Sequence, residues 1–90
     1  MNKNMMIYID DILESMKFIR EYIKNVSYKK FEEDIGIQDK VLRRLEIIGE
    51  AAAKLSSEFT KKTSKIPWRQ MIGLRNIIIH EYSSINLEEI

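Results

Sequence analysis

The residues best suited to chemistry lie close together near the C-terminus, in the segment RNIIIHEY. This segment holds His80, the only histidine of the chain, together with Arg75, Asn76 and Tyr82. On a helix, Asn76 and His80 are one turn apart and share a face, whereas Arg75 and His80 differ by about 140° in direction. Because a long arginine can bridge that angle, the spacing allows all four polar groups to meet in one patch.

These residue types suit the cleavage of RNA without a metal ion. Cleavage needs a proton acceptor for the 2′-hydroxyl, a fixed cation for the phosphate and a proton for the leaving oxygen. A histidine serves as base or acid, and the planar fork of an arginine holds two phosphate oxygens. One histidine per chain is one too few for a separate acid and base, so two copies would have to share a cleft. A lone histidine here is also typical of a helix cap or a half-buried structural side chain.

Three segments with apolar spacings of three and four predict the helices that must hold these residues. They cover residues 5–26, 41–59 and 67–80, the last opened by a proline at a position where its missing N–H costs nothing. We expect the stripes to be bundle core, and they consist of Met5, Ile9, Ile12, Met16, Ile19, Ile23 and Val26; Val41, Leu45, Ile48, Ala52, Leu55 and Phe59; and Pro67, Met71, Leu74 and Ile78.

The middle of the second predicted helix is slim, because Gly49 stands there beside the alanines 51–53. A partner helix could therefore approach it closely. Trp68, beside the stripe of the third helix, is expected in the core or as a cover over the beginning of that helix. Between the first two helices, Ser27 can cap a short helical turn, and Gly36 is the only glycine of that connection.

The last residues predict the beginning of a C-terminal helix. Asn86 is followed three residues later by Glu89, which resembles a capping box, and the chain stops at Ile90. Either the sequence is truncated there or the protein lacks a full last helix. We therefore expect one all-α domain over residues 1–90, with three long helices, one short helical turn and the start of another helix.

Composition excludes several other classes of protein. Three glycines and one proline in 90 residues argue against an all-β sandwich, and the absence of cysteine excludes disulfide scaffolds, thiolate metal sites and a cysteine nucleophile. A single histidine without an HExxH motif argues against a common zinc site, so neither a metal nor a cofactor is expected. There is no apolar run long enough for a membrane span, and acidic residues near the N-terminus do not fit a signal peptide. We expect a cytoplasmic protein whose small core favours self-association.

The net charge of +1 does not by itself indicate a nucleic-acid-binding protein. However, residues 59–80 contain five basic residues and no acidic one. Besides Arg75 these are Lys61, Lys62, Lys65 and Arg69, which we expect to bind RNA. A solvated helix end and linker is the alternative interpretation.

The string Arg75-x4-His80-x-Tyr82 resembles the signature of the HEPN superfamily, in the form found in HepT-like toxins. Three further segments resemble that family, and the similarity extends from the first helix to the end of the chain. The segments are Ile48-Gly49-Glu50-Ala51, Ile66-Pro67-Trp68-Arg69 and Leu74-Arg75-Asn76.

The resemblance implies an all-α HEPN-type bundle that forms a homodimer and places two Arg-x4-His motifs at one cleft. It also implies a metal-independent ribonuclease toxin of a type VII-like toxin–antitoxin pair. In such pairs a minimal nucleotidyltransferase antitoxin transfers AMP to the tyrosine of the motif, here Tyr82. By position, Arg75 binds phosphate, His80 is the general acid or base, and Asn76 orients the site. Family members usually continue into a full terminal helix, which this chain does not.

Two other interpretations remain at this stage. Some HEPN domains bind nucleotides or partner proteins without cutting RNA, so a non-catalytic binding module is the first alternative. A helical bundle with a purely structural role is the second. Only the enzyme predicts RNA cleavage that survives a chelator and disappears when His80 is replaced by alanine.

Overall fold

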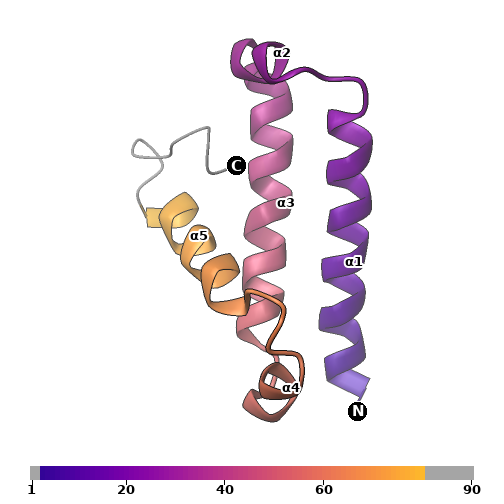
Figure 1. Ribbon diagram of the computed structural model, residues 1–90, viewed down its shortest axis with the longest axis vertical. Helices are drawn as coiled ribbons and strands as arrows, with labels where there is room; N and C mark the ends of the chain where they lie inside the picture. The colour runs from indigo at the N-terminus through magenta and orange to yellow at the C-terminus, as the bar shows by residue number, and fades with distance from the viewer. Residues whose placement is uncertain (1–2, 81–90) are drawn as a thin grey trace.

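The computed structural model of this chain describes residues 3–80, which form five helices and no strand (Figure 1). The helices are α1 (Lys3–Ile23), α2 (Tyr28–Glu33), α3 (Ile35–Ala53), α4 (Ser57–Lys62) and α5 (Trp68–His80). The prediction of an all-α fold with three long helices is confirmed. The expected helix start at Asn86 and the tyrosine of the motif, Tyr82, lie outside the described residues.

Helix α3 is the centre of the bundle, because both other long helices pack against it. Figure 1 shows α1 antiparallel to α3 on one side and α5 leaning against the other side, with α2 and α4 at opposite ends. The core lies between these helices and holds Met5, Ile12, Ile48, Ala51, Ala52 and Leu55, with Trp68, Met71 and Ile72 of α5 packed against it. None of the helices within residues 3–80 is long and apolar enough to cross a membrane.

Three cations of α3 and its C-cap lie over aromatic rings of α1. The pairs are Lys40 over Tyr22 at 5.6 Å, Arg44 over Phe18 at 4.2 Å and Lys54 over Tyr8 at 5.5 Å, each measured to the ring centroid. From Lys40 to Lys54 the residue numbers of the cations increase, while those of the rings beneath them decrease. This order is the one expected when α1 and α3 are antiparallel. Such contacts add roughly 0.5–1 kcal/mol each at exposed sites, so they reinforce the register of α1.

The buried face of α1 differs from the predicted stripe. Met5 and Ile12 are buried as expected, but Met16 and Ile23 expose 49% and 42% of their surface. Ser15, which the apolar pattern passes over, is the most deeply buried of these residues at 1% exposure. Since α3 covers one side of α1, only the part of the stripe that turns toward α3 is buried. Spacing alone does not reveal which part that is.

The second predicted helix is in fact two helices. It was expected to run to Phe59, but α3 ends at Ala53, with Lys54 as its C-cap. Ser56 then adopts an extended conformation, and its hydroxyl accepts a hydrogen bond from the Phe59 N–H at 3.2 Å, which starts α4. The apolar spacing continues across this break, because Leu55 is buried between the two helices. The serine cap was the missed signal.

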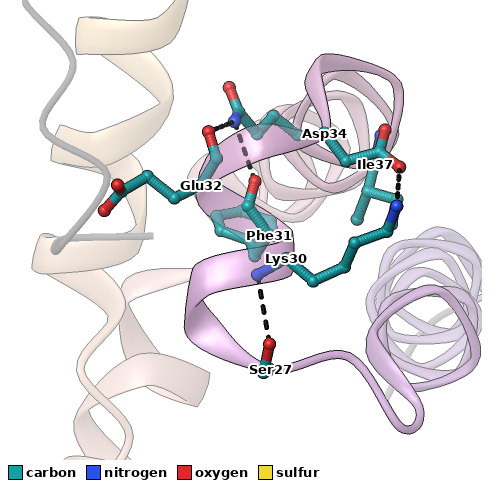
Figure 2. Close-up of polar contacts among 7 residues, drawn as sticks. Ser27, Lys30, Phe31, Glu32, Asp34 and Ile37 are labelled. Carbon is teal, nitrogen blue, oxygen red and sulfur yellow. Dashed lines mark hydrogen bonds and ion pairs between the residues drawn. The ribbon is translucent and has the colours of Figure 1, made fainter.

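The connection between α2 and α3 is one residue long and centres on Asp34. Ser27 caps α2 as predicted, since its hydroxyl accepts from the Lys30 N–H at 3.1 Å (Figure 2). Asp34 ends α2 and also caps α3, because its carboxylate accepts from the Ile37 N–H at 3.0 Å. The prediction that Gly36 lies in the connection is therefore wrong, as Gly36 belongs to the first turn of α3.

The backbone N–H of Ile37 holds the pKa of the Asp34 carboxyl below its usual range, and the nearby Lys30 ammonium, 3.5 Å away, acts in the same direction. The side chain of Gln38 completes this junction. Its amide donates to the carbonyl oxygens of Phe31 at 2.8 Å and Glu32 at 2.9 Å, so that two of the last carbonyls of α2 are satisfied.

Candidate functional site

The candidate site is carried by α5, whose beginning is held firmly in place. The indole of Trp68 donates a hydrogen bond to the hydroxyl of Thr63 at 3.0 Å, and its ring packs tilted against Phe59 with centroids 6.2 Å apart. Trp68 is thus half-buried and covers the beginning of the helix, as predicted. Pro67 directly precedes the first helical residue instead of occupying that position. The direction of α5 is therefore set about two turns before the motif begins.

Arg75 lies on the side of α5 that packs against α3. A Cβ atom placed on Gly49 would lie 2.3 Å from the Cβ of Arg75 and 3.0 Å from its Cγ, so the arginine stem rests directly on the α3 backbone. This confirms that a partner helix approaches the slim middle of α3. The side chain is half-buried, and its Nε is buried without a hydrogen-bond partner among residues 3–80.

Asn76 and His80 occupy a different face of the same helix. Both are exposed and lie one turn apart, and His80 is the last described residue of α5. Within the described part of the chain, no hydrogen bond or ion pair joins Arg75, Asn76 and His80 to one another. The fold thus holds the stem of Arg75 against α3 and leaves the imidazole of His80 open to solvent. The expected meeting of these groups with Tyr82 involves a residue outside the described range.

The predicted RNA-binding residues gather at the opposite end of α5. Lys61 and Lys62 end α4, Lys65 lies in the following connection and Arg69 is in the first turn of α5, and all four are exposed. The ammonium of Lys62 lies 3.2 Å from a carboxylate oxygen of Glu58, an acidic residue just before the basic stretch. By helix rise, Arg69 and His80 are about 16 Å apart along the axis. Any RNA that contacts both would have to run along α5.

A cavity of about 730 Å³ opens at the α4 end of the bundle. Its walls include Tyr8 of α1, Lys54 after α3 and Phe59 of α4. None of Arg75, Asn76 and His80 lines it. Within residues 3–80, no group of three His, Cys, Asp or Glu side chains is arranged to hold a metal ion. Arg75, Asn76 and His80 therefore lie on the surface of α5 and not in this cavity.

Comparison with known proteins connects this chain with one family. Residues 12–90 match the family model described as "Ribonuclease HepT-like". The chain is 42% identical over 79 residues to "Putative RNase MJ1380" of Methanocaldococcus jannaschii, covering 88% of this chain and 72% of that protein. It is 35% identical over 80 residues to "Probable ribonuclease HepT" of Thermococcus cleftensis, covering 89% of this chain and 73% of that protein. No solved structure matches the chain.

Proposed function

Because this chain belongs to the ribonuclease HepT-like family, we propose that it cleaves RNA without a metal ion and is the toxin of a type VII-like toxin–antitoxin pair. In this proposal the active form is a cytoplasmic homodimer. Two copies of Arg75, Asn76 and His80 face one cleft that takes the RNA. The single observation that carries the proposal is the family match over residues 12–90, which includes the whole motif.

The geometry of α5 supports these roles. The stem of Arg75 is held against α3, which suits a cation that must keep a phosphate in one place. His80 is exposed at the end of the described helix, which suits a group that must reach a substrate. Asn76 lies one turn before His80 on the same exposed face and can orient the imidazole or the RNA.

The cleavage step needs two histidines in different protonation states. The neutral imidazole of one protomer takes the proton of the 2′-hydroxyl while the 2′-oxygen attacks the phosphorus. The bond from phosphorus to the 5′-oxygen breaks, and the imidazolium of the other protomer gives its proton to that oxygen. The products are a 2′,3′-cyclic phosphate and a 5′-hydroxyl end. Arg75 balances the charge that builds up on the phosphate during attack.

Modification of Tyr82 is the proposed means of silencing. Tyr82 follows His80 by two residues, so a group attached to it would be tied close to the imidazole in sequence. AMP transferred there by a minimal nucleotidyltransferase antitoxin adds bulk and negative charge. That charge would repel the RNA backbone from Arg75 and His80. The support for this part is the position of the tyrosine in the sequence.

The test is RNA cleavage in EDTA by purified protein that has never met an antitoxin. Wild type is compared with His80→Ala and with Gln70→Ala, which removes an exposed polar side chain of α5 outside the motif. All three proteins are first shown to be folded and in the same oligomeric state. Wild type and Gln70→Ala should cleave, and His80→Ala should lose activity by roughly 100-fold or more.

Two results would contradict the proposal. Cleavage that persists in His80→Ala would remove this residue from the site and point to a contaminating nuclease. No cleavage by wild type, when its intact mass shows an unmodified chain, would favour the non-catalytic module that binds a nucleotide or a partner. That alternative is favoured by the open position of the motif, which lies outside the cavity of a single protomer. Binding of AMP or RNA that weakens in Arg75→Ala would then support it.

A further inference from the structure

Helices α3 and α5 approach each other closely at Gly49. A Cβ atom there would lie 2.3 Å from the Cβ of Arg75, 2.9 Å from the carbonyl oxygen of Met71 and 3.0 Å from the Cγ of Arg75. Carbon atoms in contact prefer a separation of about 3.5–4.0 Å. The Met71 oxygen belongs to the backbone, and the Arg75 Cβ is bonded directly to it. A rotation of a side chain therefore cannot move either atom away from the added methyl group. Any residue other than glycine would therefore push α5 away from α3 by roughly 1 Å.

The other interior glycine of the bundle shows that this crowding is particular to position 49. Gly73 lies on α5, two residues before Arg75, and a Cβ atom there would meet nothing within 4 Å. Packing therefore requires a glycine at 49 and not at 73. The two positions form a matched pair, since the same substitution is blocked at one and free at the other.

The consequence of this packing falls on Arg75. Its Cβ and Cγ rest on the α3 backbone, and its Nε is buried with no hydrogen-bond partner within residues 3–80. A buried N–H without a partner is costly, and in native structures such a group is explained by strain, by a catalytic role or by a water or ion that completes it. Because Cβ and Cγ are held in this way, the guanidinium of Arg75 can occupy fewer positions than that of a fully exposed arginine.

We propose that Gly49 is the positioning residue of Arg75: by having no side chain it lets α3 hold the arginine stem and so sets where the guanidinium meets the RNA phosphate. The inference rests on the proposed ribonuclease function and adds to it a residue that itself touches no RNA. Displacement of a catalytic group by about 1 Å can cost roughly 100-fold in rate. Gly49→Ala should therefore lower kcat about 10- to 100-fold, with a smaller change in KM.

The experiment combines kinetics with NMR of the arginine side chain. The Nε–Hε signal of Arg75 is identified by its loss in Arg75→Lys. In wild type this signal should show backbone-like order and slow exchange with water, unlike the signals of the exposed residues Arg43 and Arg69. Gly49→Ala should shift the signal and speed its exchange, while Gly73→Ala leaves it unchanged. The kcat and KM for RNA are then measured for both glycine variants.

Each outcome decides the matter. A mobile Arg75 side chain in the wild type overturns the inference without any variant, which covers the case in which Gly49→Ala does not fold. An unchanged Arg75 signal in a folded Gly49→Ala also overturns it, as does full activity of that variant beside an active wild type. An unmodified wild type that cuts no RNA refutes the proposed function, and the inference falls with it. A loss of kcat in Gly49→Ala alone, together with the shifted signal, supports both.

Discussion

Adding one methyl group at Gly49 and at Gly73 is expected to change the stability of the bundle in opposite directions. Both glycines lie inside helices, so alanine should gain about 0.5–1 kcal/mol at either position from the smaller loss of backbone freedom on folding. At Gly73 nothing within 4 Å opposes this gain. Gly73→Ala should therefore be more stable than wild type by about 0.5–1 kcal/mol.

At Gly49 the same gain is outweighed by overpacking. The new methyl would lie 2.3 Å from the Cβ of Arg75 and 2.9 Å from a backbone oxygen, and neither atom belongs to a flexible side-chain end. Overpacking of a tight helix contact typically costs about 1–3 kcal/mol, and this contact is severe enough for the upper part of that range. The net change should be a loss of about 1–2 kcal/mol, which leaves the two variants roughly 2–3 kcal/mol apart.

Urea denaturation followed by far-UV circular dichroism measures this difference, and protein concentration is held constant because a homodimer is proposed. In a thermal melt followed by the same signal, a domain of this size should shift its Tm by about 4–8 °C for each kcal/mol of stability gained or lost. Gly73→Ala should melt above wild type and Gly49→Ala clearly below it. Equal stability of the two variants would refute the reasoning, because it would mean that α3 and α5 do not meet at Gly49 as the structure has them.

Three further predictions concern other parts of the chain. Ser15→Ala should raise stability by about 1 kcal/mol in the same urea assay, because its hydroxyl is buried without a hydrogen-bond partner within residues 3–80; a loss of stability would show that the hydroxyl is satisfied. Because the pKa of Asp34 is lowered in the folded state, its carboxylate stabilises the fold at pH values above its ordinary pKa of 3.8. This stabilisation is lost as the pH falls through the pKa of the folded state. Relative to Asp34→Asn, which keeps a cap, wild type should therefore lose stability on acidification, whereas a difference independent of pH would contradict this. The double variant Lys61→Glu, Lys62→Glu should stay folded and bind RNA more weakly at low salt. The slope of the logarithm of the binding constant against the logarithm of the salt concentration should become shallower by about 1–2. Unchanged binding would show that neither lysine contacts RNA.

Much of the fold could be predicted because its signals are local. A serine at position 27 caps a helix through its own hydroxyl, and a proline at 67 fixes backbone angles just before α5, so both boundaries fall within a residue of the prediction. The slim segment around Gly49 is likewise a property of its side chains alone. The break at Ser56 was missed, because buried Leu55 lets the apolar spacing run on while the chain leaves the helix.

The candidate site divides in the same way. The sequence by itself determined that Arg75, Asn76 and His80 share one helix and that Asn76 and His80 share a face, since helical periodicity depends only on spacing. Only the tertiary structure decided that the Arg75 stem lies on α3 while His80 faces solvent. It also decided which side of α1 is buried. These features depend on which surfaces of different helices meet. The spacing of residues along the sequence indicates the apolar face of each helix, but not which other helix packs against that face.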